Sequence, residues 1–521
     1  MTPLQQSEKK YTTKSGENFP RFVNFAVQMV LFTHSYFYRF DEKQWRNRQP
    51  YPPYGTLLAA AVVRECGFET AFFDVALEND PARIRPVLQT MRPKYLIIYD
   101  DGFNYLTKMC LTRMREAAFA LTAFGRDVGC LVVVCSSDSS DHAPLYLEKG
   151  ADFVIPGEGE AALRALLVAA ETCRDADDVR AQEAELIAAL PYPVCARSAP
   201  AGQPDKKPQI MRDLDALPDP AWDLVDMAAY RAVWMRTHGY FSLNLATTRG
   251  CPYKCNWCAK PIYGNRYHAR SPERVVAEIA RLIHHYGATH FWMADDIFGL
   301  KPGWVQRFRA LVQEQGLVFR YKIQSRADLL LQEDTIDALA ASGADQVWIG
   351  AESGSQKILD AMDKGITIAH LHEATRLLRA KGIEVCFFLQ FGYIGETADD
   401  IAATLQLLDT LQPDDVGISV SYPLPGTGFY EKVRATLGPV HNWKDSDDLA
   451  LLYRSTYSPD FYRRLHRLVH RRFRMRRAQA LLRRPAPLRH RLYLRVRWAG
   501  HAVGYWWNKW KMATLRERPV L

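Results

Sequence analysis

The chain lacks several features that would assign it to common protein classes. Its 521 residues contain no run of about 18 uninterrupted apolar residues, so the sequence predicts no membrane-spanning helix. The N-terminal segment Met1–Pro20 is polar and has no apolar stretch of the kind that a secretory signal peptide needs. Ten cysteines, most of them among apolar neighbours, are too few for a disulfide scaffold. These absences favour a reducing, cytoplasmic location.

Acidic residues are almost absent from the C-terminal end. From Phe461 to Leu521 there are 18 Lys and Arg residues and one acid, Glu517. This segment has a net charge of +17, whereas the whole chain has a net charge of +9. The other 460 residues therefore carry a net charge of −8. The body is therefore mildly acidic, and the basic segment needs an explanation of its own.

Short apolar runs alternate with amphipathic stretches in the first part of the chain. Buried strands are expected at Val27–Phe32, Thr70–Phe73, Tyr95–Tyr99, Leu131–Cys135 and Phe153–Ile155. Helical periodicity lies between them, at Thr56–Cys66 and Lys108–Phe124. This alternation predicts an α/β fold with a doubly wound, Rossmann-like sheet over residues 22–172, which binds ligands beyond the carboxyl ends of its strands. Residues 173–238, acidic and then rich in proline and alanine, are expected to be a linker.

Six more strand–helix units follow. Strands are expected at Ser242–Ala246, His290–Met293, Arg320–Gln324, Gln346–Gly350, Val385–Gln390 and Val416–Val420. Amphipathic helices are expected at Glu273–Tyr286, Trp304–Gln315, Thr335–Ser342, Ser355–Met362, Ile368–Lys381 and Thr397–Leu411. The series predicts a partial (β/α)6 barrel over residues 239–440, with its chemistry on the loops at the carboxyl ends of the strands. Residues 441–521 are expected to form a basic, aromatic, helical region.

Three cysteines stand close together after the first barrel strand. Cys251, Cys255 and Cys258 have the spacing Cys-x3-Cys-x2-Cys. Three thiolates leave one position of a tetrahedral structural zinc site empty. A 4Fe–4S cluster held by three cysteines instead keeps one iron open for a substrate or cofactor. The alternative is a zinc knuckle whose fourth ligand is not visible in the sequence.

This spacing, with the aromatic Trp257 before the third cysteine, resembles the radical S-adenosylmethionine (SAM) superfamily. The resemblance implies that SAM chelates the open iron and is reductively cleaved to a 5′-deoxyadenosyl radical. It also implies an electron donor such as flavodoxin or ferredoxin. Residues at later strand ends match the family's SAM contacts: Asp295 and Asp296 for the amino group, Arg326 for the carboxylate, Glu352 and Ser353 for the ribose and methionine, and Gly392 near adenine. Helix capping and an ordinary salt bridge at the barrel rim are the alternatives for these polar residues.

The N-terminal region resembles the cobalamin-binding domain that is fused to many radical SAM enzymes. The matching residues are Pro53 and Gly55 before the first helix, Ser136 and Ser137 after the fourth strand, and Gly157, Glu158, Gly159 and Glu160 after the fifth. No Asp-x-His-x-x-Gly motif occurs, so the resemblance implies cobalamin bound without a histidine ligand from this domain. Family members often have Gly-Gly where Ser136 and Ser137 stand. A degenerate domain that no longer binds cobalamin is the alternative. His34, Tyr36, Tyr38 and Tyr99 are expected to line the cobalt face.

The resemblance implies a cobalamin-dependent radical SAM enzyme that modifies an unactivated carbon of a small, hydrophobic substrate. Methyl transfer is the leading expectation, and oxidative cyclisation of a tetrapyrrole-like substrate or tRNA modification are the alternatives. The sequence assigns no catalytic acid, base or radical quencher.

Aromatic residues are interleaved with the basic ones from Arg463 to Lys511, where there are sixteen Lys and Arg residues and no acid. Trp, Tyr and Arg together favour a peripheral contact with the inner face of a membrane. Packing of a helical cap on the acidic body is the first alternative. Nucleic-acid binding, with stacking on bases, is the second.

Overall fold

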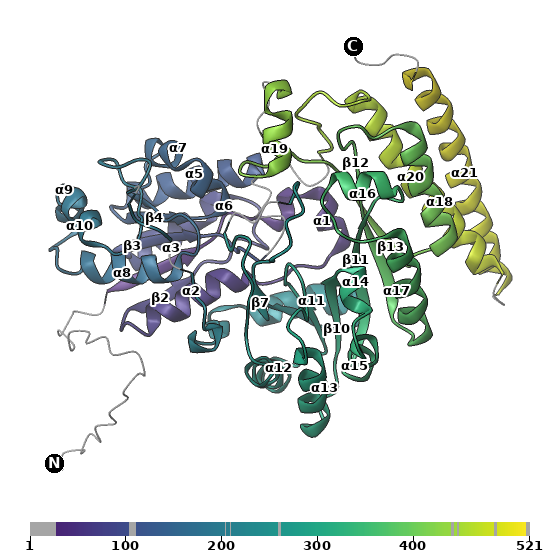
Figure 1. Ribbon diagram of the computed structural model, residues 1–521. Helices are drawn as coiled ribbons and strands as arrows, with labels where there is room; N and C mark the ends of the chain where they lie inside the picture. Colours follow the sequence, from purple (N-terminus) through teal and green to yellow (C-terminus); the bar gives the residue numbers. More distant parts are fainter. Residues whose placement is uncertain are drawn as a thin grey trace.

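Two parallel sheets form the body of the protein. The computed structural model describes residues 28–516 except 104–110, 204, 209, 259–261, 439–441, 445–447 and 484–486. The expected N-terminal segment Met1–Pro20 and the start of the expected helix Lys108–Phe124 lie outside the described residues. In Figure 1 the N-terminal sheet and its helices lie on one side, the barrel in the middle, and a helical pair at the far edge.

The N-terminal sheet has five parallel strands in the order β2-β1-β3-β4-β5. The strands are β1 Met29–Thr33, β2 Glu69–Phe72, β3 Tyr95–Tyr99, β4 Leu131–Cys135 and β5 Phe153–Val154. Alternate residues of each strand point to opposite faces, and both faces are covered by helices. The helices of this part are α1 Glu42–Asn47, α2 Tyr54–Arg64, α3 Arg85–Met91, α5 Thr112–Asp127, α6 Ser137–Asp141, α7 Ala143–Glu148 and α8 Glu160–Ala170. The strand order reverses between β1 and β3, which is where such sheets bind ligands.

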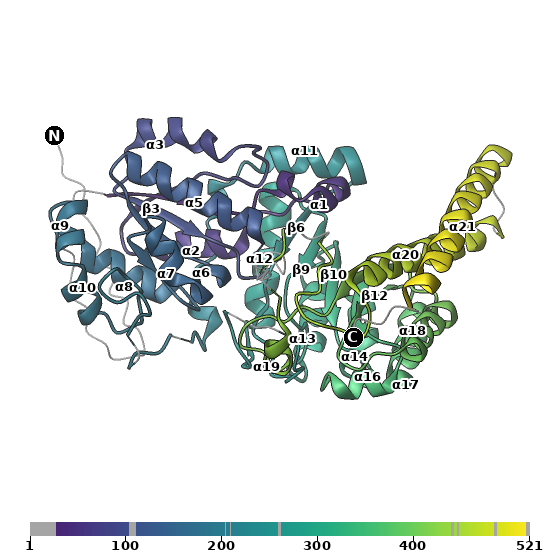
Figure 2. The same cartoon turned by 90° about the horizontal axis from the view of Figure 1, so that it is seen from above.

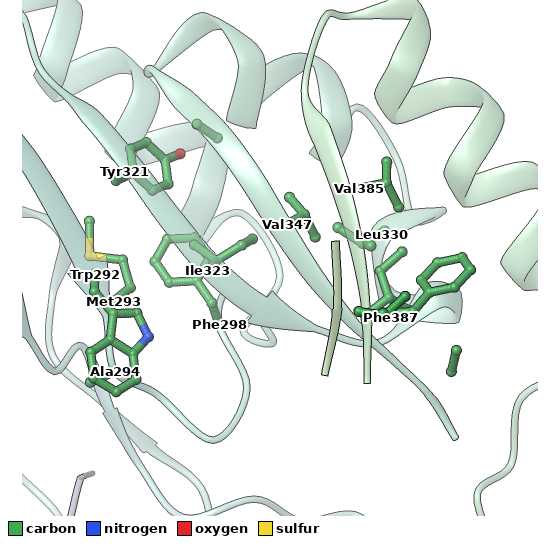
Figure 3. Close-up of a cluster of buried hydrophobic side chains, with 14 of the residues drawn as sticks. Trp292, Met293, Ala294, Phe298, Tyr321, Ile323, Leu330, Val347, Val385 and Phe387 are labelled. Atoms are coloured by element: carbon green, nitrogen blue, oxygen red, sulfur yellow. The ribbon is translucent and has the colours of Figure 1, made fainter. Parts of the chain in front are cut away.

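The second sheet is a six-stranded, parallel half-barrel in the order β13-β12-β11-β10-β9-β6. Its strands are β6 Ser242–Leu245, β9 His290–Met293, β10 Arg320–Ser325, β11 Ala344–Glu352, β12 Glu384–Phe391 and β13 Asp415–Val420. Its helices are α12 Pro272–Tyr286, α13 Trp304–Glu314, α14 Ala327–Leu330, α15 Thr335–Ala341, α16 Gln356–Ala361, α17 Ile368–Ala380, α18 Ala398–Leu411 and α19 Gly428–Val433. Figure 3 shows the packed layer between sheet and helices, with Tyr321 and Ile323 of β10 pointing into it. The predicted partial (β/α)6 barrel is confirmed.

The segment 173–238, predicted to be a linker, is more structured than the sequence suggests. It contains α9 Ala176–Ala181, α10 Glu183–Ala189 and α11 Met227–His238. Val179 and Ile187 are buried against the N-terminal core, and Tyr230 and Trp234 are buried against the barrel. The helices have only 6, 7 and 12 residues, so each is too short for a clear helical period in the sequence.

The C-terminal region is helical, as predicted. It consists of α20 Pro459–Leu482 and α21 Leu488–Arg516, which pack on each other (Figures 1 and 2). Helix α20 lies against β13, the last strand of the half-barrel, and Arg472 forms an ion pair with Asp409 of α18. No helix in the described parts of the chain combines the length and the apolar character that crossing a membrane requires.

Candidate active site

The three cysteines lie on one long loop at the carboxyl end of β6. The loop is closed at its base by the antiparallel pair β7 Thr248–Arg249 and β8 His268–Ala269. Gly250 stands at this base with φ 75°, and a side chain there would collide with the backbone carbonyl of Arg266. Only glycine fits a left-handed position with a backbone so close. The chain therefore enters the loop through a fixed turn immediately before Cys251.

The cysteine loop is also held from the barrel side. The side-chain amide of Asn256 donates to the carbonyl of Ala361 at 2.8 Å and to the carboxylate of Asp363 at 2.6 Å. The hydroxyl of Tyr393 donates to the Asn256 side-chain oxygen at 2.7 Å. Asn256 lies between Cys255 and Cys258, so these bonds fix the ligand loop itself. Sequence analysis missed Asn256, because its partners are more than 100 residues away.

Three cysteines on one loop suit a cluster better than a single ion. Cys251, Cys255 and Cys258 are all partly exposed. Across the described residues, no set of three His, Cys, Asp or Glu side chains converges closely enough to hold one metal ion. A zinc knuckle would require its thiolates within about 2.3 Å of one ion. A 4Fe–4S cluster binds each thiolate through a separate iron, so three cysteines leave its fourth iron open.

Two buried cations stand beside the cysteine loop. Arg326 stacks on Tyr253, with its guanidinium carbon 3.7 Å from the ring centroid, and donates to the Lys364 carbonyl at 2.7 Å. The ammonium of Lys364 lies 5.9 Å from the Trp257 ring centroid and pairs with Glu352 at 2.8 Å. Both cations interact electrostatically with Cys255. Lys364 was not found from the sequence.

The predicted SAM-contact residues end four neighbouring barrel strands. The Asp295 carboxylate accepts from the backbone N–H groups of Thr247 and Thr248, at 2.7 and 2.8 Å, and so fixes the start of the cysteine loop. Burial raises the pKa of Asp295 to about 6, against the opposing effect of these bonds. Asp296 is exposed, so the two members of this acidic pair differ in environment. The Arg326 guanidinium is paired with Asp328, at 3.0 Å.

Glu352 is the most strained of these residues. Its φ is 57° at the end of β11, a conformation that is unfavourable for a residue with a side chain. Strain of this kind persists where the surroundings enforce it and is concentrated at functional sites. Ser353 beside it is buried and contacts the hydroxyl of Thr404 at 3.2 Å. Gly392 has φ 86° and donates its N–H to Glu396 at 2.7 Å. Each of these roles toward SAM stays a prediction.

The residues predicted at the N-terminal cofactor site surround the carboxyl ends of β3, β4 and β5. Pro53 precedes α2, and the Gly55 N–H donates to Asp101 at 3.1 Å. Ser136 caps α6, with Ser137 buried behind it. Gly157 has φ 73°. Their roles toward a cofactor stay a prediction.

The two carboxylates of the Gly-Glu-Gly-Glu segment have a specific partner. Glu158 and Glu160 pair with the buried guanidinium of Arg249, at 3.0 and 2.7 Å. Arg249 immediately precedes the turn into the cysteine loop. A Cβ on Gly159 would collide with Cys135 and Tyr99, so glycine is needed there for close packing. The segment therefore connects the N-terminal sheet to the cysteine loop.

A cavity of about 1250 Å³ joins the N-terminal sheet to the barrel lumen. His34 and Asp101, which follow β1 and β3, line one part of it, and Trp292 and Trp348 line the lumen. Tyr36 and Tyr38, expected at the cobalt face, also line the cavity. Tyr99 does not, which is a correction: it lies in the core beside Cys135 and Gly159 because its strand position faces α2 and α8.

The sequence has recognisable relatives. Residues 245–408 match the family described as the Radical SAM superfamily. An uncharacterised methyltransferase of Pyrococcus horikoshii is 28% identical over 45% of this chain and 50% of its own length. The anaerobic magnesium-protoporphyrin IX monomethyl ester cyclase of Rubrivivax gelatinosus is 24% identical over 78% of this chain and 70% of its own length. The first of these alignments thus spans only about half of the relative.

Two solved structures share the architecture. The radical SAM methyltransferase TsrM from Kitasatospora setae, with cobalamin and a [4Fe-4S] cluster bound, is 19% identical over 78% of each chain, with a TM-score of 0.61. The cobalamin-dependent radical SAM enzyme OxsB, with aqua-cobalamin and SAM bound, is 17% identical over 92% of this chain and 72% of its own, with a TM-score of 0.66. This resemblance shows the fold. The match over residues 245–408 identifies a radical SAM domain that includes the cysteine loop and most of the half-barrel.

Proposed function

We propose that this protein is a cobalamin-dependent radical SAM enzyme that modifies an unactivated carbon, by methyl transfer, on a small substrate with a hydrophobic body. The observation that carries the proposal is the single cavity that runs from the carboxyl edge of the N-terminal sheet into the barrel lumen. A cofactor at the reversal point of the first sheet and a substrate in the lumen would share this space. The fold resemblance to TsrM and OxsB supports the same assignment.

The residues present fit the implied groups. The cysteine loop offers three thiolates beside two cations, and the carboxylate of Asp296, exposed at the end of β9, is the group that we expect to bind the ammonium group of SAM. At the N-terminal sheet, Pro53 and Asp101 line the cavity, and His34 there is paired with Asp74 at 3.0 Å. This carboxylate fixes the orientation of the imidazole ring. When bound, the cluster supplies an electron for SAM cleavage and cobalamin supplies the methyl group.

Oxidative cyclisation is the second candidate function. The cyclase of Rubrivivax gelatinosus aligns with 78% of this chain, whereas the Pyrococcus methyltransferase aligns with 45%. A cyclase would consume SAM to abstract hydrogen and would transfer no methyl group to the product. The isotope from methyl-labelled SAM therefore separates the two functions.

The first test is cofactor retention after anaerobic purification and reconstitution with iron, sulfide and hydroxocobalamin. We expect the broad iron–sulfur absorption, one extractable cobalamin per chain, and formation of 5′-deoxyadenosine when a reductant and SAM are added. A chain that retains the cluster but releases all cobalamin on desalting would contradict the proposed cobalamin dependence. The N-terminal sheet would then be a scaffold, and chemistry by the adenosyl radical alone would replace methyl transfer.

We also propose that α21 docks on an anionic membrane surface. The large hydrophobic side chains that are exposed on it are Leu488, Leu492, Tyr493, Val496, Val503, Trp506, Trp507 and Trp510. Lys509 and Lys511 lie over the rings of Trp506 and Trp510, at 4.9 and 4.7 Å. Aromatic rings flanked by cations suit the headgroup region of anionic lipids. Helix α20, by contrast, packs on the acidic body of the protein, because Arg472 and Arg476 both form ion pairs with Asp409 of α18.

We expect the triple variant Trp506→Ser, Trp507→Ser, Trp510→Ser to lose co-sedimentation with phosphatidylglycerol vesicles. The control is Val318→Ser, which removes an exposed hydrophobic side chain on the barrel. Truncation at Tyr462 is a poorer test, because it also removes most of α20, which lines the cavity. Equal vesicle binding by the triple variant and the control would contradict the membrane proposal. If added RNA abolishes vesicle binding, the result would favour the nucleic-acid alternative.

A further inference from the structure

Lys322 is a positively charged residue inside the barrel that no motif predicted. Successive residues of β10 point to opposite faces. Tyr321 and Ile323 pack under the helices (Figure 3), whereas Lys322 and Gln324 line the cavity. The Lys322 ammonium lies 5.3 Å from the Tyr51 ring centroid and 5.5 Å from that of Trp292. Over the described residues, the structure gives it these two ring contacts and no hydrogen bond or ion pair.

An unpaired ammonium in an aromatic wall is costly without a counter-charge. Asp345 of β11 is the acidic residue that interacts electrostatically with Lys322. Its carboxylate lies 3.6 Å from an imidazole nitrogen of His290. Glu384, also on the cavity wall, accepts a hydrogen bond from Gln346 at 3.0 Å. Among the described residues neither carboxylate forms an ion pair with Lys322, although one buried oxygen of Asp345 has no hydrogen-bond partner. The counter-charge that Lys322 lacks would therefore come from a molecule in the cavity.

The side of the cavity formed by α1 and α20 is strongly basic. Its cationic side chains are Lys43 and Arg46 of α1 and Arg463, Arg467, Arg471 and Arg474 of α20. The four acids that line the cavity are Asp101, Asp345, Glu384 and Asp415, and none of them lies on α1 or α20. A concave surface of one sign concentrates ligands of the opposite sign and speeds their entry. This side therefore selects anions, although the body of the protein is acidic.

The lumen walls next to Lys322 are flat and apolar. Trp348 and Phe388 stack with their ring centroids 4.7 Å apart, and Tyr51 and Trp292 complete the aromatic lining. Aromatic walls favour a planar or extended apolar group between them. The arrangement thus combines an apolar slot, one internal cation and a basic entrance.

We propose that the cavity binds a substrate that has a flat apolar body and an anionic group, a carboxylate or a phosphate, which forms an ion pair with Lys322. This deepens the proposed function, on which it rests for the identity of the ligand as substrate. The arginines of α20 draw the anionic group inward, and the aromatic lumen holds the apolar body. The substrate class is therefore amphipathic and acidic rather than purely hydrocarbon.

The test uses small aldehydes that form an imine with an amine, trapped by cyanoborohydride and mapped by peptide mass spectrometry. Pyridoxal 5′-phosphate is compared with pyridoxal, and 4-formylbenzoate with benzaldehyde, on the reconstituted full chain. We expect at least one anionic aldehyde to label Lys322 about tenfold or more faster than its neutral analogue, because the basic side of the cavity concentrates the anion near this amine. Benzoate, which can pair with the ammonium but has no aldehyde, should slow the labelling of Lys322 at pH 7 if the ion pair forms. Exposed Lys149, in the same digest, should show a ratio near one. A preference for the phosphate or for the carboxylate aldehyde identifies which anion the site takes.

The pH profile gives an independent readout. Burial lowers the pKa of Lys322 to about 8, against the opposing influence of Cys386 and Asp345, while Tyr51 faces the ammonium from the other side. The neutral amine that attacks an aldehyde therefore becomes abundant above pH 8, whereas an ordinary lysine needs a pH near 10.4. Labelling of Lys322 should rise between pH 7 and 9 and then level off.

Matched variants locate the steering charge. Arg467→Gln with Arg474→Gln should bring the anionic-aldehyde rate at Lys322 down toward that of the neutral analogue, because both side chains line the cavity. Arg464→Gln with Arg483→Gln should leave this rate unchanged, because Arg464 of α20 and Arg483, the C-cap of the same helix, do not line the cavity. Equal labelling by charged and neutral aldehydes, or no labelling of Lys322, overturns the proposal. If the anionic aldehydes label Lys322 preferentially but the protein does not retain cobalamin, the proposed function is refuted and the anion site at Lys322 is still supported.

Discussion

Cys255→Ala should abolish both the iron–sulfur absorption and SAM cleavage. Cys255 is the middle ligand of the loop, and Arg326 and Lys364 act on it electrostatically. With two thiolates left, the cubane lacks a ligand on a second iron, so SAM has no defined binding iron. We expect iron content and formation of 5′-deoxyadenosine to fall to background after reconstitution.

The same variant should retain cobalamin, because the N-terminal site does not include the cysteine loop. Cys66→Ala is the matched control: Cys66 is also partly exposed but lies after α2, and burial raises the pKa of its thiol. It should keep cluster, cobalamin and SAM cleavage. A Cys255→Ala protein that still binds the full cluster would show that the metal ligands lie elsewhere. Loss of both cofactors would indicate misfolding, which thermal denaturation of the unreconstituted chain would reveal.

Arg249→Met should be the most destabilising single substitution at the junction of the two sheets. Its side chain is 3% exposed, and those of its partners Glu158 and Glu160 are each 5% exposed. Removing the cation leaves two buried carboxylates without compensation, which costs about 3–5 kcal/mol. Arg307→Met, which breaks an exposed pair with Glu273, should leave the free energy of unfolding almost unchanged, because solvent screens this pair.

The loss should depend on pH. Burial raises the pKa of Glu158, and Arg249 opposes that rise. Without Arg249 the folded-state pKa rises further above the unfolded value, so the stability of the variant is highest at low pH and falls as pH increases. Urea denaturation at pH 5 and pH 8 should show a larger deficit at pH 8. Adding Glu158→Gln and Glu160→Gln should restore stability at pH 8, and a deficit that this change leaves intact would contradict the ion-pair explanation.

Local patterns predicted the sheets well because each strand is a short apolar run between polar turns. His290–Met293 was located to the residue, and both ends of β11 were missed. The last residue of β11 is Glu352, whose buried carboxylate is neutralised by an ion pair with Lys364. Such compensation comes from tertiary contacts and leaves no trace in a local pattern.

The site was only partly predictable, for the same reason. Spacing within one loop identified Cys251, Cys255 and Cys258, whereas the partners of Arg249 lie about 90 residues earlier in the chain. Nothing in the sequence distinguishes Lys322 from a solvent-facing residue of an alternating strand. Curvature of the sheet turns that face into the wall of a cavity, and this becomes visible only when all six strands are placed.

The contact of α20 with β13 has a consequence for biosynthesis. A half-barrel that does not close leaves its last strand with an unpaired edge, which invites association with other chains. Helix α20 lies against that strand, and Arg477 donates to the Asp414 carbonyl at its start, at 3.3 Å. At about 5–20 residues per second, translation needs roughly 3–12 s to proceed from the end of β13 to the end of α20. During that interval the edge of β13 is exposed in the nascent barrel. A chaperone that binds extended segments would bind at this edge.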